Sequence, residues 1–509
     1  MAGGDGQPAL QVIILGSGGG PLEDNTTAFL VRSTATGWKK GSVLAVDAGV
    51  HLASIVRILE NHPSDSSPDH ADKPVTLING PFEGLEIPHS LAKSNAAYIT
   101  RTLVGTYLIT HPHLDHISGF VVNTAALQGS RPKVLAGLPS TIEAFKDHIF
   151  NNVIWPNLSD ENNGAGLVTY RRLVEGGSPA LGQGDDKGYI EICEGLGVKT
   201  LSVSHGHCIE RHSHRGSNVG LASSPPPYGS PPQTRQRTGS QVLNPPLFGR
   251  SPSVTNIPSL DMRMADVQER ICVYDSSAYF IRDIATGKEV LIFGDVEPDA
   301  ISLWPRNKQV WIEAAPKIAS GRLGGILIEC SFDDSQTDDR LYGHLAPRYL
   351  IEELKALADE VELYKKGKEQ ATSKERATSK KRKRLSATLE EGARQHLPRT
   401  RSGRTSSPSP RSRTRSQLTE TAVTEAGGSE AHTAEAKSVT AGADSRFSLR
   451  GKSKFPLKGV KIVIIHVKDT LDDGPGMGTK ILEELTRYEE EEQIGCEFVI
   501  SKMGQAVYL

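Results

Sequence analysis

Residues 110–119 read Thr110-His111-Pro112-His113-Leu114-Asp115-His116-Ile117-Ser118-Gly119, and they place three imidazoles and a carboxylate close together. The preceding Tyr107-Leu108-Ile109-Thr110 is an apolar run typical of a buried strand, so we expect the histidines on the loop that follows it. His111 and His113 can face one ion, whereas Asp115 and His116 can reach a second ion beside it. Zinc and manganese accept such ligands and leave a coordination position for water. The stretch therefore predicts a site for two metal ions.

Length and composition favour one large domain. The chain has 509 residues, enough for two or three domains, but much of it is biased sequence that cannot pack a core. The formal net charge is -2 and aromatic residues make up 6%, so there is no overall basic field for nucleic acid.

Cysteine usage and hydropathy indicate a soluble protein of a reducing compartment. The 5 cysteines are scattered and form no CxxC pair. The N-terminus lacks a signal-peptide pattern, and no apolar run approaches the roughly 20 residues that a membrane span needs. We expect a cytoplasmic protein without a membrane partner.

Two further carboxylates lie at predicted strand ends. The run 289–293 is apolar and leads into Gly294-Asp295, which would place Asp295 at the same sheet edge as the histidines. We expect Asp295 to bridge both ions, because a shared carboxylate holds two metals about 3.5 to 4 Å apart. The strand 42–49 ends with Asp47, which either braces the metal loop or caps a helix starting near His51.

Two inserts interrupt the predicted domain, which comprises residues 8–365 and 455–509. Residues 223–258 are rich in Pro and Ser, and residues 366–454 are charged and without apolar periodicity, so we expect both to be disordered. Lys380-Lys381-Arg382-Lys383-Arg384 is either a solvated charge run or a nuclear import signal. The Arg-Leu-Ser that ends at Ser386 looks like a target of a cyclic-nucleotide-dependent kinase.

The motifs carry a family resemblance. His-x-His-x-Asp-His after a strand resembles the metallo-β-lactamase superfamily, and the longer run from His111 to Phe120 is similar to the class II cyclic-nucleotide phosphodiesterases within it. Glu329-Cys-Ser-Phe, Gly343-His344-Leu-x-Pro and a final His466-x-Lys are similar to the same enzymes. The resemblance implies an α/β fold, a metallo-β-lactamase-like four-layered αββα sandwich with two mixed sheets.

The resemblance also implies a set of site residues. One ion would be held by His111, His113 and His205, the other by Asp115, His116 and His466, with Asp295 between them and Asp47 bracing the metal loop. We expect two divalent ions, zinc foremost, although manganese and magnesium accept similar ligands. Asp115 is expected to be catalytic as well as ligating. His344 either contacts the phosphate, protonates the leaving oxygen, or merely caps or packs.

The activity implied is hydrolysis of 3′,5′-cyclic nucleotides, cAMP and also cGMP, to 5′-monophosphates, which lowers cyclic-nucleotide signalling. A hydroxide shared by two cations is a competent nucleophile, and the cations neutralise charge on the phosphoryl oxygens. A nuclease of the tRNA 3′-end type is the alternative enzyme, but the basic run lies in an insert and nucleic acid is not favoured. A non-catalytic scaffold that binds partners through its inserts is the alternative from another class.

Overall fold

The computed structural model describes residues 7–62, 74–126, 131–182, 187–210, 270–393 and 454–509. The chain divides into one unit of residues 1–365 with 454–509 and another of residues 366–453. The insert predicted at 223–258 lies outside the described residues.

The first sheet is mixed. In order of hydrogen bonding, its described strands are β16 (Ala506–Tyr508), β1 (Leu10–Gly16), β2 (Ala28–Ser33), β3 (Val43–Ala48), β6 (Val104–Leu108), β7 (Lys133–Gly137) and β8 (Val168–Arg172). Pairing is antiparallel from β16 to β3 and parallel from β3 to β8. Strands β4 (Val75–Thr76) and β5 (Glu86–Ile87) form a separate small pair.

The second sheet has the same mixed character. Its described strands, in order, are β15 (Glu497–Ile500), β14 (Lys461–Ile465), β13 (Leu323–Glu329), β12 (Glu289–Phe293), β11 (Arg270–Asp283), β10 (Leu196–Glu210) and β9 (Ile190–Cys193). Pairing is parallel from β15 to β12 and antiparallel from β12 to β9. The residues that join β10 to β11 include the Pro- and Ser-rich insert.

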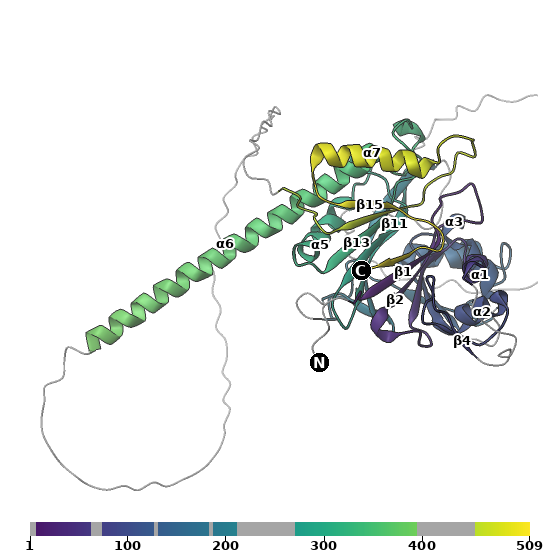
Figure 1. Cartoon of the computed structure of the whole chain (residues 1–509), viewed down its shortest axis with the longest axis horizontal. Coiled ribbons are helices and arrows are strands. Elements are labelled where there is room, and N and C mark those ends of the chain that lie inside the picture. Colours follow the sequence, from purple (N-terminus) through teal and green to yellow (C-terminus); the bar gives the residue numbers. More distant parts are fainter. Residues whose placement is uncertain (1–6, 63–73, 127–130, 183–186, 211–269, 394–453) are drawn as a thin grey trace, which may run out of the picture. The chain divides into compact units, whose positions relative to one another are not determined.

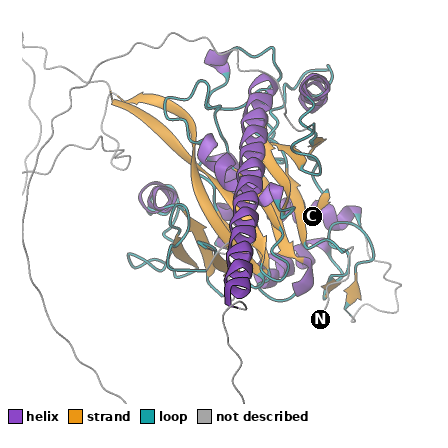
Figure 2. Cartoon of the chain, turned by 90° about the vertical axis from the view of Figure 1, so that its left-hand side faces the viewer, coloured by secondary structure: helices purple, strands orange, loops and turns teal. Residues whose placement is uncertain are grey.

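Helices cover the outer face of each sheet. The helices are α1 (Leu52–Asn61), α2 (Ala92–Tyr98), α3 (Leu114–Thr124) and α4 (Pro139–Ala144) on the first sheet, and α5 (Asn307–Ala319), α6 (Pro347–Ala393) and α7 (Met477–Glu492) on the second. Figure 1 shows α1 and α2 beside β1 and β2, and α5 and α7 beside β13 and β15. Figure 2 shows strands with helices on their outer sides.

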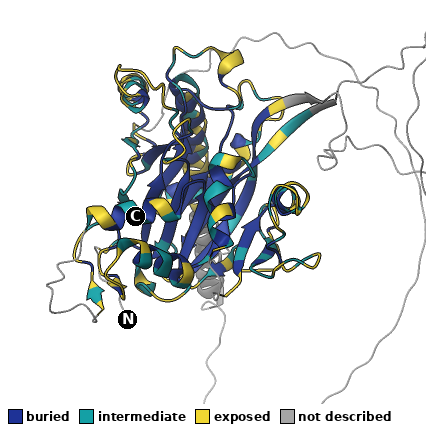
Figure 3. Ribbon diagram, turned by 90° about the vertical axis from the view of Figure 1, so that its right-hand side faces the viewer, coloured by how far each residue is buried: buried dark blue, intermediate teal, exposed yellow. Residues whose placement is uncertain are grey.

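Three buried clusters separate these layers. Alternate strand residues such as Val12, Val46 and Ile292 face the other sheet and form the cluster between the two sheets. The intervening residues face the helices, in one cluster around Phe120 and another around Trp311. Figure 3 shows buried residues along the strands and exposed ones on the outer helices and loops. The predicted four-layered αββα sandwich is thus confirmed.

Helix α6 corrects the prediction of disorder at its start. We expected the disordered insert to begin at residue 366, but the helix continues to Ala393. Its apolar positions, among them Leu350, Leu354 and Val361, are buried against the second sheet, whereas residues 363–372 are all exposed. In the sequence, residues 366–393 are rich in Lys, Ala, Glu and Arg, which have high helix propensity, although they lack apolar periodicity. Residues 394–453 lie outside the described part of the chain.

Smaller corrections concern element ends. Strand β15 is an edge strand as expected, but the chain continues through residues 501–505 to β16, which pairs with β1 of the first sheet.

Among the described residues, no helix combines the length and the apolar character that a membrane crossing requires.

Candidate metal centre

Strand ends deliver most of the predicted site residues. Asp47 lies near the end of β3, His111 follows β6, Asp295 follows β12 and His466 follows β14. Strands β3 and β6 are parallel neighbours in the first sheet, and β13 and β14 are parallel neighbours in the second. The carboxyl ends of these strands therefore meet at one edge of the sandwich.

Three site residues lie on elements other than those expected. Asp115 and His116 belong to the first turn of α3, not to a loop, and His113 is the extended residue just before that helix. A carboxylate is favourable in the first turn because it faces the positive end of the helix dipole. His205 lies inside β10, where the pairing with β11 shifts between Ser204 and His207, so a bulge rather than a strand end turns its ring toward the centre.

Asp295 lies at the centre of the cluster and is buried. Its carboxylate oxygens lie close to the Nε2 atoms of four histidines, at 3.2 Å from His116, 3.3 Å from His466, 3.5 Å from His205 and 3.6 Å from His111.

The side chains form two groups that share Asp295. One group is His111, His113, His205 and Asp295, and the other is Asp115, His116, Asp295 and His466, with all ligand atoms of a group within 4.8 Å of one another. All seven residues predicted as ligands therefore lie together, divided as the sequence analysis divides them. Nitrogen and carboxylate oxygen are the donor set of zinc and related divalent ions.

Buried polar atoms without hydrogen bonds support this fit. Within the described part of the chain, His116 Nε2, His466 Nε2 and Asp295 Oδ1 are buried and form no hydrogen bond. Such atoms are costly unless a partner satisfies them. Cations bound between the histidines and Asp295 would supply that partner, so the residues fit divalent ions.

Asp47 anchors the metal loop from behind. Its Oδ1 accepts the Thr110 backbone N–H at 2.8 Å, and its Oδ2 accepts both the Thr110 hydroxyl and His116 Nδ1–H, each at 2.8 Å. The Thr110 hydroxyl in turn lies 3.1 Å from His111 Nδ1. Since Nδ1 of both rings is engaged, Nε2 is the atom that each presents to the centre. The alternative role for Asp47, capping the following helix, finds no support, since α1 begins without a side-chain cap.

Two more histidines are held in the same way. His205 Nδ1–H donates to the Gly343 carbonyl at 2.8 Å, and His466 Nδ1 lies 2.8 Å from the Thr27 hydroxyl, which donates to the Gly18 carbonyl. Both rings therefore direct Nε2 inward. The sequence analysis assigned no role to these anchoring groups.

Burial keeps most of these imidazoles neutral. It lowers the pKa of His113 to about 4 and the pKa values of His111 and His466 well below the ordinary value. Burial also opposes a charge on His116, but Asp295 and Asp47 raise the pKa of His116 well above its usual range. Neutral imidazoles have a lone pair to offer, and a bound cation would displace the proton of His116.

Two glycines permit close approach of the backbone to the centre. A Cβ on Gly19 would lie 2.5 Å from the His466 ring, and a Cβ on Gly294 would lie 2.6 Å from the Thr110 hydroxyl oxygen. The Gly-rich turn after β1 therefore packs against a site histidine.

His344 joins the cluster through a residue that the sequence analysis missed. His344 is buried, and its Nδ1 lies 3.0 Å from both carboxylate oxygens of Glu329. Glu329 also accepts the Ser331 hydroxyl and the Val296 backbone N–H. Its position at the end of β13 was the available signal, since carboxylates also mark the ends of β3 and β12.

A comparison with known proteins shows which family the chain resembles. The family model of the class-II cAMP phosphodiesterases matches residues 74–181 and 240–375, which include residues 111–116, Asp295, Glu329 and His344. The matched segments make up just under half of the chain, which is similar to this family over these residues. The segments that carry His205 and His466 lie outside the match. The assignment of these two histidines to the metal centre therefore rests on the ligand geometry described above.

Relatives named as 3′,5′-cyclic-nucleotide phosphodiesterases agree with this assignment. The protein from Schizosaccharomyces pombe is 27% identical over 69% of this chain and 75% of its own length. The Saccharomyces cerevisiae protein is 27% identical over 68% of this chain and 82% of its own length. The crystal structure of unliganded yeast PDE1 has the same fold, with a TM-score of 0.56 and 20% identity over 99% of this chain and 100% of that one.

Proposed function

We propose that this protein is a class-II phosphodiesterase that hydrolyses 3′,5′-cyclic nucleotides, with cAMP as the first substrate and cGMP as a second, to 5′-monophosphates. The observation that carries the proposal is the pair of ligand groups joined by Asp295. Similarity to the family and the names of the relatives supply the substrate class. The activity would lower cyclic-nucleotide signalling.

The proposed cofactors are two divalent ions, with zinc the best match to a set of five histidines and two aspartates. His111, His113, His205 and Asp295 would hold one ion, and Asp115, His116, His466 and Asp295 the other. Bound there, the ions would supply Lewis-acid stabilisation of the phosphoryl oxygens and lower the pKa of water. Metal analysis of the purified protein should find about two zinc ions per chain; manganese or magnesium instead would change the proposed metal.

The chain's own residues would move two protons. Asp115 is the part-exposed carboxylate of the centre, with Oδ2 3.7 Å from His466 Nε2, and we infer that it would take a proton from the attacking water. Glu329 engages Nδ1 of His344, which leaves Nε2 to deliver a proton to the 3′ oxygen as the P–O3′ bond breaks. The water oxygen then remains on phosphorus, and the product is the 5′-monophosphate.

Product analysis tests this assignment. Chromatography of a cAMP reaction against authentic standards should show 5′-AMP alone. Accumulation of 3′-AMP would mean that the other ester bond is cleaved, and it would contradict the placement of the leaving oxygen.

Regulation and location remain proposals from the sequence. Ser386 and Lys380–Arg384 lie in the part of α6 whose side chains are not described. We infer that a cyclic-nucleotide-dependent kinase modifies Ser386, and that the protein is cytoplasmic with nuclear entry through the basic run. Phosphate incorporation that persists unchanged in Ser386→Ala would refute the kinase site. Exclusion of the tagged full-length chain from nuclei would refute the import signal.

A further inference from the structure

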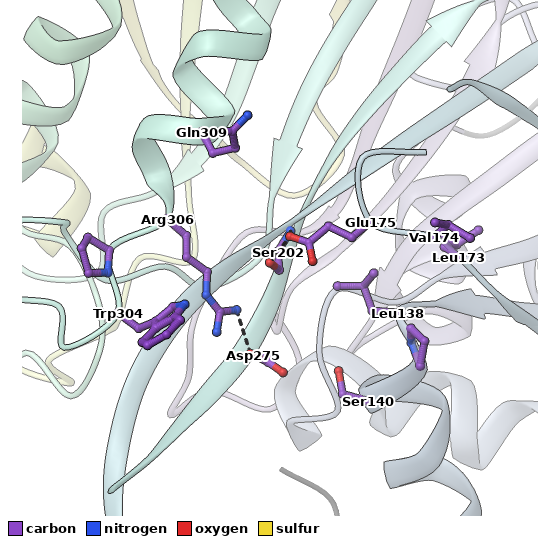
Figure 4. Close-up of a pocket in the computed structure, with 12 residues that line it drawn as sticks. Leu138, Ser140, Leu173, Val174, Glu175, Ser202, Asp275, Trp304, Arg306 and Gln309 are labelled. Atoms are coloured by element: carbon purple, nitrogen blue, oxygen red, sulfur yellow. Dashed lines mark hydrogen bonds and ion pairs between the residues drawn. The ribbon is translucent and has the colours of Figure 1, made fainter. Parts of the chain in front are cut away.

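A cavity of about 720 Å³ opens between the two sheets, away from the metal ligands themselves. One wall comes from the segments after β7 and β8, with Leu138 and Val174, and the other from the loop before α5, with Trp304 and Arg306 (Figure 4). Ser202 and Glu175 lie between these walls in the same view. Its volume is within the range of cavities that bind small molecules.

Both walls continue directly into the metal centre. Strand β7 pairs with β6, and Ala136 accepts the backbone N–H of Ile109, two residues before His111. On the other side, Asp275 lines the cavity and pairs in register with Ser204, the residue before His205. The ring of Tyr274, the neighbour of Asp275, lies 5.9 Å from the ring of His113. The cavity therefore lies beside the segments that carry the metal ligands.

Apolar and polar groups face the cavity in a pattern that suits a flat heterocycle. Trp304 and Val174 are large apolar residues that leave 51% and 57% of their surface exposed. An aromatic face of this kind is a stacking surface for a base.

Hydrogen-bonding groups of both kinds are also available. Arg306 is mostly buried and donates one N–H to Asp275 at 2.8 Å, while among the described residues its Nε and Nη2 have no partner. Glu175 Oε1 accepts the Ser202 N–H and hydroxyl, and its Oε2 has no partner in the described part of the chain. Purines offer ring acceptors for a guanidinium and an amine or ring N–H for a carboxylate.

We propose that this cavity binds the purine base of the substrate, with Trp304 packed on the ring, Arg306 donating to a ring acceptor and Glu175 accepting from the amine. This inference rests on the proposed function and adds to it a site for the base. Trp304 and Glu175 are then specificity-determining residues that have no role in cleavage of a phosphodiester without a base.

The test compares two substrates in the full-length metal-loaded protein. Values of kcat/KM are measured for cAMP and for bis(p-nitrophenyl) phosphate, which has no base, in Trp304→Ala and Glu175→Gln. Matched controls are Tyr364→Ala, an exposed aromatic on α6, and Glu194→Gln, an exposed acid paired with Lys39. Thermal melting verifies that each variant is folded.

We expect the ratio of cAMP to bis(p-nitrophenyl) phosphate kcat/KM to fall about tenfold in both cavity variants, through KM for cAMP, and to stay constant in the controls. A parallel fall for both substrates, or no change for either, would overturn the base site while leaving the proposed function standing. Wild-type protein that cleaves only the diester without a base would instead refute the proposed function, and the base site with it.

Discussion

Asp47 links the first sheet to the metal centre through one side chain. It holds Thr110 and His116 together, and it does so from a backbone with φ of 52°, in the left-handed region that few non-glycine residues adopt. His466 is also in this region, with φ of 57°. Strain of this kind persists only where the surrounding contacts over-determine it, as they do at functional sites.

Replacement of Asp47 should weaken the centre without unfolding the protein. In Asp47→Asn, the amide cannot accept from both Thr110 and His116 as the carboxylate does, so the ring of His116 loses its fixed orientation. We expect kcat/KM for cAMP to fall about 10- to 100-fold, with weaker metal retention on dialysis. Asp24→Asn, which alters an exposed ion pair with Arg57, is the control and should match wild type. Wild-type activity in Asp47→Asn would refute the anchoring role.

The loss of activity on replacing Glu329 should depend on the leaving group of the substrate. In Glu329→Gln, His344 loses the charged partner that holds its ring, so Nε2 is no longer fixed toward the leaving oxygen. Cleavage of cAMP expels an alkoxide and needs a proton at that oxygen, so kcat should fall about 100-fold or more. Bis(p-nitrophenyl) phosphate expels the stable p-nitrophenolate, and its kcat should fall far less. Equal losses for the two substrates would indicate that Glu329 only maintains the fold.

At the scale of elements, the turn after β1 supports His466. A methyl group on Gly19 would meet the His466 ring at 2.5 Å, and the backbone of Gly18 pairs with that of Val467, the next residue. We expect Gly19→Ala to displace the ring, lower the stability by about 1 to 3 kcal/mol and reduce metal content. Urea unfolding and metal analysis measure the two effects. Gly476→Ala is the matched control, since a Cβ there meets no atom within 4 Å and its φ of -55° suits any residue.

Elements whose sequence pattern matches their burial could be predicted from the sequence. The strands before His111, Asp295 and His466 are apolar runs that end in a polar residue, and parallel strand ends meet at one sheet edge, so a metal site at that edge could be expected. The full ligand set came from the family resemblance. The bulge that turns His205 inward could not be predicted from the sequence, because a register shift depends on the strand with which β10 pairs. Helix α6 beyond residue 365 was missed because it has no apolar periodicity, although its composition favours helix.

The contacts that hold the site together could not be predicted in the same way. In the sequence, Glu329 is recognisable only as the end of a buried strand. Its contact with His344 depends on the fold. The cavity between Leu138 and Trp304 joins segments more than 160 residues apart, which the sequence alone does not pair.

At the scale of the whole molecule, the catalytic unit and the charged insert are separate units. Buried side chains of α6 occur up to residue 362, and all residues from 363 to 372 are exposed. Replacement of residues 370–450 by a flexible Gly-Ser linker should therefore change kcat/KM for cAMP by less than about twofold, since distant, independent regions contribute additively. Loss of activity as severe as that of Asp295→Ala would show that the insert is part of the catalytic fold.

The central claim is that cyclic-nucleotide cleavage depends on divalent ions held by the two groups that share Asp295. The most direct measurement is cAMP turnover by purified protein before chelation, after chelation and after zinc is restored, with His113→Ala and Asp295→Asn treated identically. We expect wild-type activity to disappear with the chelator and return with zinc, and both variants to stay inactive throughout. Turnover that survives chelation, or that persists in Asp295→Asn, would contradict the account.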